Sequence, residues 1–369
     1  MTALSSVNKP NEWDWRSGSL VYGKGMAKNR ITLDDVARAA GVSAITASRA
    51  LRQPEKVSES ARARILSAVQ QLGYVPDAAA SALASTRTSV VGLLVPSLTN
   101  AVFADFLRGV YDAIEDTSLT IQIGNFRYSP SKEEALIRTF LHQRPAGLIV
   151  AGVNQTDAAR RMLMDAPCPV VQTMETSDQP VDRIIGFSQY ASGEMVARHL
   201  IDAGYRRPGL LGARMDPRAQ ARIAGYRSGL QAVGLDDARR MFTTPQPSSV
   251  GMGGQLLSDL LAVAPDTDAV FCANDDLAAG ALFEAQRRGM RVPDSFGICG
   301  FNDLEMSRHM VPPLTSVSTP RYEVGRGAID LIRAALDPAS GDTPRRIELD
   351  VSMSLRGTTR SVQTERIAP

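Results

Sequence analysis

The chain has 369 residues, of which 44% are hydrophobic and 22% are charged, and its formal net charge is +2. These values are typical of a globular protein of two to three domains, and they exclude disordered, collagen-like and coiled-coil chains. No apolar run approaches the ~20 residues that span a bilayer, and residues 1–25 lack the apolar core of a signal peptide. We therefore expect a cytoplasmic protein with no membrane partner.

Residue types that carry catalytic or metal chemistry are sparse. The chain has no G-x-S-x-G motif, no P-loop and no CxxC pair, so we expect no enzymatic activity and no cofactor. The histidines have no second ligand at metal-binding spacing, which argues against a metal site: His142, His199 and His309. The cysteines lie far apart beside apolar residues, and we expect reduced, buried thiols: Cys168, Cys272 and Cys299.

The charge is concentrated near the N-terminus. Residues 28–88 contain nine basic and five acidic residues, whereas residues 89–369 carry a net charge of −3. A chance fluctuation of this size is common, but a basic segment is also what a nucleic-acid-binding domain requires. Residues 1–27 show little periodicity and are expected to form a flexible leader.

The basic segment contains the pattern of three short helices. They are expected between Thr32 and Gly41, between Ser43 and Leu51, and between Ser58 and Gly73. Each begins at a serine or threonine that can accept a backbone N–H, and two of them end at a glycine that can adopt a left-handed conformation. Apolar residues recur at helical spacing in the third helix, so the segment is expected to form one small bundle.

The first two helices have the length and turn of a helix-turn-helix, whose second helix would enter the DNA major groove. The helix-turn-helix segment contains small hydroxyl side chains that can bond phosphate oxygens: Thr32, Ser43, Thr46 and Ser48. Arg49 can reach a guanine edge, and Ala44 and Ile45 can contact a thymine methyl group. Arg52 and Ser58 are further candidates for DNA contact. A helical hairpin that serves packing alone is the alternative.

From Val90 onward, β-rich runs alternate with amphipathic helices. Eight strands are expected: 90–95, 119–124, 147–152, 169–173, 183–187, 209–212, 268–273 and 296–301. Such alternation demands parallel sheets covered by helices on both faces. Because about 280 residues is too long for one doubly wound sheet, we expect two lobes with a ligand cleft at the carboxyl ends of the strands.

These segments resemble the lactose/galactose repressor (LacI/GalR) family of transcriptional regulators over residues 30–358. Residues 32–51 match the headpiece of the family, 54–58 its loop, and 72–83 its link and hinge helix. The resemblance implies a homodimer that binds a pseudo-palindromic double-stranded DNA operator, with Leu83 of both subunits inserted into the central minor-groove step. The asparagine of the family after Pro76 is Asp77 here, which can cap the hinge helix or weaken its docking on phosphate.

Loop motifs in the body match the periplasmic-binding-protein-like core of the family: 96–103, 222–226, 271–278, 300–303 and 318–321. A narrower similarity to the gluconate-utilisation repressor branch is carried by residues 51–58, 211–216 and 271–277. The resemblance implies a small-molecule effector, here gluconate or a related sugar acid, held between the lobes. It also implies a repressor whose lobes shift on ligand binding and thereby couple the cleft to the hinge helices.

Three residues of the cleft carry the expectation of a sugar acid. Arg222, at the effector-arginine position of the family, can hold a carboxylate through two parallel bonds, and Asn274 can bond adjacent hydroxyls. Asn302 stands where many sugar-binding relatives have an aspartate, which would repel an anion. Further candidates are Asn100, Phe103, Glu175 and Arg321. Phe103 can instead be core, Glu175 a solvated loop carboxylate, and Arg321, like Arg214, part of an ion pair.

The expected architecture is therefore α/β, with two doubly wound periplasmic-binding-protein-like lobes preceded by a small all-α helix-turn-helix headpiece. The expected domains are a leader (1–27), headpiece (28–75), hinge (76–88), N-terminal lobe (89–187 and 319–338), C-terminal lobe (188–318 and 339–358) and tail (359–369). Two alternatives share this body: a sugar-binding protein without a transcriptional role, and a regulator that responds to a neutral sugar. An enzyme would need an acid/base pair in the cleft, and the sequence shows none.

Overall fold

The computed structural model describes residues 13–14, 19–20, 31–75, 87–339, 341 and 344–361. The chain divides into two compact units, Met1–Ser85 and Thr86–Pro369, which are described separately. In the first unit, strand β1 (Trp13–Asp14) pairs antiparallel with β2 (Ser19–Leu20). Most of the leader expected at 1–27 lies outside the described residues, as does the hinge helix expected at 77–84 with Leu83.

Three helices of the first unit form the small bundle that the sequence predicts. They are α1 (Leu33–Ala40), α2 (Ala44–Arg52) and α3 (Glu59–Leu72), and the 3-10 turn η1 (Pro54–Lys56) precedes α3. The Thr32 and Ser43 side chains cap the first two helices, while Gly41 and Gly73 end α1 and α3 at positive φ. The core joins one side of each helix: Val36, Ala40, Ala50, Ile65 and Ala68.

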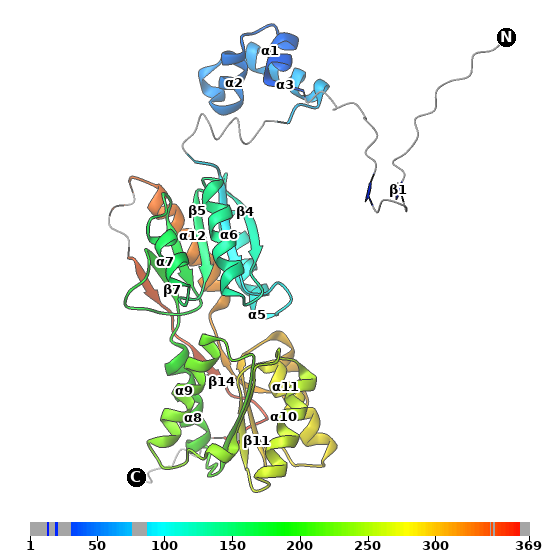
Figure 1. Cartoon of the computed structure of the whole chain (residues 1–369), viewed down its shortest axis with the longest axis vertical. Helices are drawn as coiled ribbons and strands as arrows, with labels where there is room; N and C mark the ends of the chain where they lie inside the picture. The colour runs from blue at the N-terminus through cyan, green and yellow to red at the C-terminus, as the bar shows by residue number, and fades with distance from the viewer. Residues whose placement is uncertain are drawn as a thin grey trace, which may run out of the picture. The chain divides into compact units, whose positions relative to one another are not determined.

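The second unit contains two lobes, each built on a six-stranded sheet (Figure 1). The sheet of the N-terminal lobe has the order β13-β7-β6-β5-β3-β4 and is parallel throughout. Its strands are β3 (Val90–Val95), β4 (Thr120–Asn125), β5 (Gly147–Ala151), β6 (Val170–Thr173), β7 (Arg183–Gly186) and β13 (Arg346–Glu348). Their apolar runs are buried because helices cover both faces.

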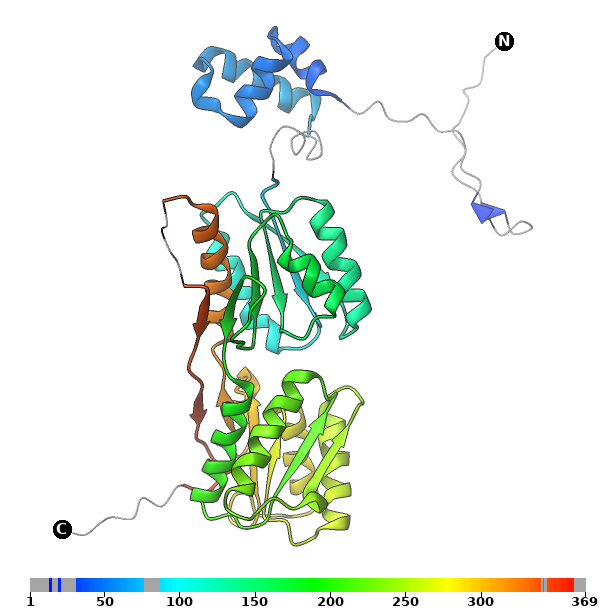
Figure 2. The same ribbon diagram turned by 60° about the vertical axis from the view of Figure 1, so that its left-hand side comes forward.

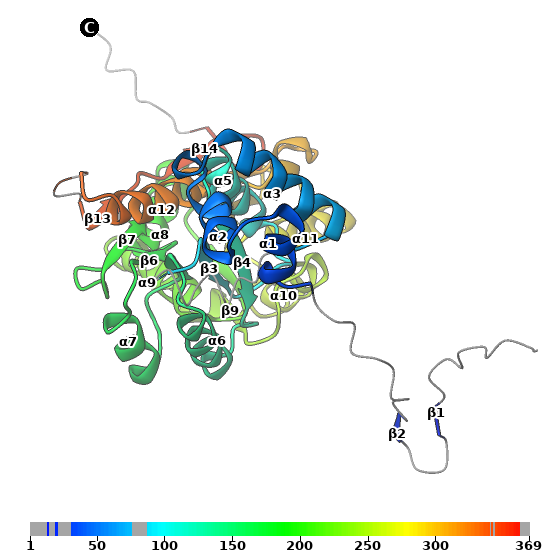
Figure 3. The same ribbon diagram turned by 90° about the horizontal axis from the view of Figure 1, so that it is seen from above.

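The helices of the N-terminal lobe lie in two layers. Helices α5 (Val102–Ile114) and α12 (Arg321–Leu336) pack on one face of the sheet, and α6 (Pro130–His142) and α7 (Asp157–Met164) pack on the other. Figure 3, seen along the long axis, shows these two layers on either side of the strands. The resulting sandwich orients the carboxyl ends of the strands toward the second lobe.

The C-terminal lobe has a similar sheet with the strand order β14-β12-β11-β10-β8-β9, in which only the edge strand β14 is antiparallel. Its strands are β8 (Pro208–Ala213), β9 (Met241–Thr244), β10 (Ala269–Cys272), β11 (Gly297–Asn302), β12 (Thr315–Ser318) and β14 (Ser352–Ser354). Helices α8 (Gln189–Asp202) and α9 (Pro217–Gln231) cover one face, and α10 (Val250–Val263) and α11 (Asp275–Arg287) cover the other. The 3-10 turns η2 (Ala238–Arg240) and η3 (Glu305–His309) complete this lobe.

The chain passes between the lobes after β7, after β12 and after β13, and Figure 2 shows these connections side by side. Strand β13 pairs with β7, so it belongs to the N-terminal lobe and not to the C-terminal lobe, where the sequence placed residues 339–358. The expected tail also begins too early, because Thr359 is buried and its hydroxyl bonds His199 and Thr315 of the C-terminal lobe. Both differences arise from long-range pairings of short segments.

The described residues agree with two further expectations, which concern the strands and the cysteines. The eight predicted strands are all present, and each end agrees with the prediction to within one residue. Strands β9, β12, β13 and β14 were not predicted because they are short and rich in polar residues. Cys168, Cys272 and Cys299 are free and buried. Within the described part of the chain, no helix is long and apolar enough to cross a membrane, and no group of three metal-ligating side chains occurs.

Candidate functional sites

The exposed face of α2 is the candidate DNA-binding surface. Ala44, Ile45, Ser48, Arg49 and Gln53 line a shallow groove on it, while Ala47 and Ala50 of the same helix point into the headpiece core. The Ile45 side chain is 71% exposed at the start of the helix. A large apolar side chain held in solvent by a rigid helix is suited to contact an apolar group of a partner.

Two of the four expected phosphate-binding hydroxyls, those of Thr32 and Ser43, serve as helix caps. The Thr32 hydroxyl donates to the Asp35 carboxylate over 2.7 Å, and the Ser43 and Thr46 hydroxyls lie 2.8 Å apart. Ser58, at the N-cap position of α3, makes no capping bond with its side chain. The Arg49 side chain is exposed and forms no hydrogen bond or ion pair with another described residue, so its guanidinium is available to contact a DNA base. The side chain of Arg52, another predicted DNA contact, lies outside the described part of the structure.

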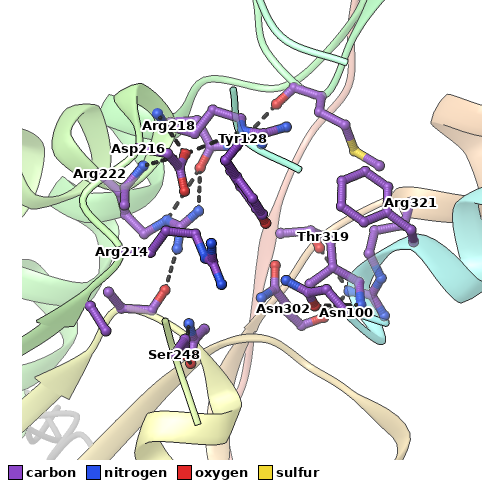
Figure 4. A pocket seen from close by; sticks show the side chains of 18 of the residues that line it. Asn100, Tyr128, Arg214, Asp216, Arg218, Arg222, Ser248, Asn302, Thr319 and Arg321 are labelled. Carbon is purple, nitrogen blue, oxygen red and sulfur yellow. Dashed lines mark hydrogen bonds and ion pairs between the residues drawn. The ribbon is translucent and has the colours of Figure 1, made fainter. Parts of the chain in front are cut away.

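The second candidate site is a cleft between the two lobes of the body, shown in Figure 4. It contains about 690 Å³ of empty space, part of it open to solvent. Its walls come from loops that follow the carboxyl ends of β3, β4, β6 and β7 in one lobe and of β8, β10, β11 and β12 in the other. Six of the seven predicted effector residues line it: Asn100, Phe103, Arg222, Asn274, Asn302 and Arg321.

Arg222 projects into this cleft from α9 and is only 8% exposed. Its Nε and Nη2 donate to Gln189 Oε1 at 3.2 and 2.8 Å, and its Nη1 donates to the carbonyl of Ala273. Two of the five guanidinium N–H groups are therefore left over. Burial lowers the pKa of Arg222 to about 9, so the group remains charged at neutral pH.

The hydrogen bonds of Arg222 to described residues all go to uncharged groups, although Asp216, Asp275 and Glu175 lie near enough to act against the lowering of its pKa. Besides the two oxygen acceptors, the guanidinium carbon lies 3.5 Å from the centroid of the Phe301 ring. No carboxylate of a described residue lies within ion-pair distance of it. A buried cation without an anionic partner is unfavourable unless something supplies the missing charge. The unused N–H groups of Arg222 therefore make it a candidate for holding an anionic ligand.

Gln189 holds Arg222 in place because two helices come unusually close. Gln189 is the first residue of α8, and its Nε2 donates to the carbonyl of Met174 in the other lobe. Helices α8 and α9 cross at Gly193 and Gly225, where an added Cβ would lie about 2.0 and 1.9 Å from a backbone oxygen of the opposite helix. These glycines allow the backbone contact that brings Gln189 to the arginine.

Two asparagines line the C-terminal side of the cleft. The Asn274 amide oxygen accepts from the backbone N–H of Leu277 at 3.0 Å and its Nδ2 donates to Ser248 at 2.7 Å, so this side chain caps α11 as well as lining the cleft. The Asn302 side chain is 6% exposed and makes no hydrogen bond with a described residue. Its φ of 108° is one that asparagine tolerates better than most residues. An amide with free donor and acceptor atoms thus faces the cleft.

The predicted residues from the N-terminal side have partners within the protein. Arg321 donates to Asp105 Oδ2 at 2.8 Å and to Thr319, and its Nε is buried without a partner among the described residues. Asn100 caps the turn before α5 by accepting from Val102 N–H, and Phe103 packs edge to face against Phe106. Arg321 thus forms the ion pair that the sequence left open, although it also lines the cleft.

Four further residues of the cleft were not assigned to it from the sequence or, in the case of Arg214, were left open: Tyr128, Arg214, Asp216 and Arg218. The Arg214 guanidinium stacks on the Tyr128 ring at 4.2 Å and joins the two lobes, and Arg218 pairs with Asp216 at 3.5 Å. Glu175 does not line this cleft; it lines a neighbouring cavity instead. Tyr128 lies on the loop after β4 and Arg218 in the first turn of α9, and no local pattern predicts that they line one site.

The charge balance of the cleft favours an anionic ligand. Among the described lining residues, four are arginines and one is an acid: Arg214, Arg218, Arg222, Arg321 and Asp216. Even when Asp105 behind Arg321 is counted, positive charge is in excess. In a partly buried site, Coulomb interactions are several-fold stronger than in water, so this excess selects against cations.

Comparison with known proteins matches two family models to this chain. Residues 32–77 match the model of the lacI family of bacterial regulatory proteins, and residues 197–359 match that of the periplasmic binding protein-like domain. The HTH-type transcriptional regulator GntR of Pseudomonas aeruginosa is 43% identical over 326 residues, which cover 88% of this chain and 94% of the relative. The chain belongs to the LacI family.

Two further relatives span the LacI-family chain almost end to end. The HTH-type transcriptional regulator GntR of Escherichia coli is 34% identical over 90% of this chain and 100% of its own. The crystal structure of a LacI family transcriptional regulator from Silicibacter pomeroyi is 37% identical, covers 89% of this chain and 99% of that one, and superposes with a TM-score of 0.84. The protein is therefore a DNA-binding transcriptional regulator with a helix-turn-helix headpiece and two periplasmic-binding-protein-like lobes, and not an enzyme.

Asp275 is a buried residue next to the cleft of this LacI-family protein, and its carboxylate binds segments that adjoin the cleft. Helix α11 starts at Asp275 and is capped by Asn274. The fully buried Asp275 carboxylate accepts from Leu304 N–H, Ser307 and Ser316 at 2.6–3.0 Å. It thereby joins the segments after β10 and β11 to β12, next to the cleft residues Asn274 and Asn302.

We expect the stability contributed by Asp275 to depend on pH. Burial, only partly offset by the three hydrogen bonds, raises the pKa of this carboxyl from 3.8 to about 6. The folded state therefore holds the proton more tightly, and the stabilisation is complete below the unfolded pKa and is lost as the pH rises through about 6. The unfolding free energy of Asp275→Asn relative to wild type should rise by about 1 kcal/mol between about pH 5 and about pH 7. Urea denaturation at both pH values measures it; a constant difference would contradict the raised pKa.

Proposed function

We propose that this LacI-family regulator is a cytoplasmic, homodimeric repressor whose operator affinity is controlled by a small sugar acid such as gluconate. The observation that carries the choice of ligand is the buried guanidinium of Arg222, which has two N–H groups to spare and no carboxylate partner among the described residues. A carboxylate can accept two parallel bonds from such a group and supply its missing counter-charge.

The rest of the proposed site suits a hydroxylated chain attached to that carboxylate. Asn302 offers a free amide, and Asn274 and Ser248 offer polar atoms beside it. Phe103 can pack against the carbon backbone of the ligand. An aspartate in place of Asn302 would add a negative charge near the bound anion, which the amide avoids. A neutral sugar would leave Arg222 without a counter-charge, and we therefore favour a sugar acid.

We propose that the lobes transmit binding to the DNA through the segment between headpiece and body. Ligand in the cleft favours one relative orientation of the lobes, since it contacts both. Residues 77–84 are too few for a helix that is stable in isolation, so their order depends on what aligns the two subunits. We take residues 28–75 as the headpiece and 76–88 as the hinge. Ligand and DNA affinities should be coupled reciprocally by about 1–3 kcal/mol.

Fluorescence anisotropy with palindromic DNA selected from a random pool tests the proposal. The full chain should bind a specific duplex, and D-gluconate should change that affinity about tenfold or more, whereas D-glucose should not. A response to glucose but not to gluconate would replace the sugar acid by a neutral sugar. Failure to select any duplex at low salt would refute operator binding by this chain.

Arg49→Ala should weaken binding to the selected duplex by about 1–3 kcal/mol, because the free guanidinium of Arg49 is placed to bond a guanine edge. Binding to a scrambled duplex should weaken much less, since it depends on phosphate contacts. Arg38→Ala is the matched control, because Arg38 is exposed on α1 and paired with Asp35. Equal losses on both duplexes would mean that Arg49 contacts only phosphate.

A further inference from the structure

A second cavity opens beside the cleft, and it contains about 780 Å³ of empty space including its open side. Four residues line both spaces, so the two spaces adjoin along them: Tyr128, Arg214, Asp216 and Arg218. Tyr128 comes from the N-terminal lobe and the other three come from the C-terminal lobe, and Figure 4 shows them together at one side of the cleft. We call the cleft around Arg222 the inner cavity and this space the outer cavity.

The outer cavity contains a polar atom that the protein leaves unsatisfied. Glu175 lines it and is 8% exposed, and its Oε2 is buried with no hydrogen-bond partner among the described residues. An unpartnered buried carboxylate oxygen is costly, by about 1–3 kcal/mol or more. Burial raises the pKa of Glu175, against the opposing effect of Arg218. A ligand group that donates a hydrogen bond to Oε2 would remove this penalty.

Hydrogen bonds orient the polar side chains Gln155 and Glu133, which line the outer cavity. Gln155 Nε2 donates to the carbonyl of Gly152 at 3.0 Å and to Glu133 Oε1 at 3.3 Å, while Gln172 Nε2 donates to Gln155 Oε1 at 2.9 Å. Glu133, 5% exposed, thus has a weak partner, and burial raises its pKa as well. These polar groups are pre-organised, which lowers the entropic cost of binding a ligand.

The charges of the outer cavity select against ions of either sign. Arg214 and Arg218 line it and disfavour a metal ion or an ammonium group, and Glu133, Glu175 and Asp216 disfavour an anion. A hydroxyl group donates to a carboxylate and accepts from a guanidinium or an amide, so it suits both kinds of lining residue. Phe126 and Tyr128 add aromatic surface on which the C–H groups of a polyol can pack.

We propose that the outer cavity is a subsite for neutral hydroxyl groups of the effector that lie far from its carboxylate, with Glu175 as the principal acceptor. This inference rests on the proposed function, in which Arg222 binds the carboxylate in the inner cavity. The effector is then a hydroxy acid long enough to extend from Arg222 in the inner cavity, past Tyr128 and Arg214, into the outer cavity. A short hydroxy acid reaches Arg222 but leaves the outer cavity to water.

Isothermal titration calorimetry of the full chain with D-gluconate and with D-glycerate, which has the carboxylate but lacks the distal hydroxyls, tests the subsite. Wild type should bind gluconate at least tenfold more tightly than glycerate. Glu175→Gln, which keeps the shape of the side chain, should lower the gluconate affinity at least tenfold more than the glycerate affinity. Glu323→Gln makes the same chemical change at an exposed position of α12 and should alter neither affinity.

The outcomes separate this inference from the proposed function. If Glu175→Gln weakens both acids equally, or neither, the outer cavity is not the hydroxyl subsite although gluconate remains the effector. If wild type binds neither acid, the sugar-acid effector itself is wrong. Gln155→Ala provides a second variant if Glu175→Gln does not fold, as judged by its melting temperature, and it should show the same preferential loss of gluconate binding.

Discussion

Arg222→Ala is expected to abolish the response to a sugar acid while operator binding persists. Arg222 lies in the body and makes no contact in the headpiece core, so its loss leaves the DNA-binding face of α2 unchanged. Removing one partner of a buried, hydrogen-bonded charge pair costs about 2–5 kcal/mol, which lowers the affinity for gluconate by about thirtyfold or more. Titration calorimetry and anisotropy with and without gluconate measure the two effects.

Two further variants test the chemistry of this site. Arg222→Lys keeps the positive charge but not the fork of N–H groups, and it should recover only part of the affinity because a carboxylate is then held by a point charge. Arg227→Ala is the matched control on α9, since Arg227 pairs with Asp236 near the surface. An Arg222→Ala protein that responds at the wild-type gluconate concentration would contradict the carboxylate-binding role.

Gly225→Val is expected to reduce both the stability of the body and effector binding. The new Cβ would lie 1.9 Å from the backbone oxygen of Tyr190 on α8, so the two helices must separate. Backbone cannot yield as a flexible side chain does, and we expect a loss of about 3 kcal/mol or more in unfolding free energy. Because Gln189 begins α8 and Arg222 lies one turn before Gly225, the separation also breaks the bond that orients the guanidinium.

The control for this variant is Ala224→Val on the same turn. Ala224 is exposed, so the same side chain should lower stability only by the difference in helix propensity, about 0.5 kcal/mol. Thermal unfolding followed by circular dichroism compares the two, and calorimetry with gluconate reports the site. Full stability and full gluconate affinity in Gly225→Val would show that α8 and α9 are not locked at this crossing.

Much of the headpiece could be predicted because its signals are local. Thr32 and Ser43 cap helices within three residues, and Gly41 and Gly73 end helices at positive φ, so neighbouring residues contain the information. The apolar strands of the body were recognised for a similar reason, since a strand covered on both faces must be apolar along its length. Strand β13 was assigned to the wrong lobe, because which sheet a short, polar strand joins depends on a distant partner.

The amino-acid sequence alone determined that this chain has a helix-turn-helix headpiece, a two-lobed α/β body and an arginine placed to meet an effector. Tertiary structure decided the contacts of that arginine and of its neighbours. Gln189 reaches Arg222 across 33 positions and Asp105 pairs with Arg321 across 216, while Glu175 enters a separate cavity. Caps and hydrophobic periods act over a few residues, whereas a binding site forms where distant loops converge, and only packing of the whole lobes specifies that convergence.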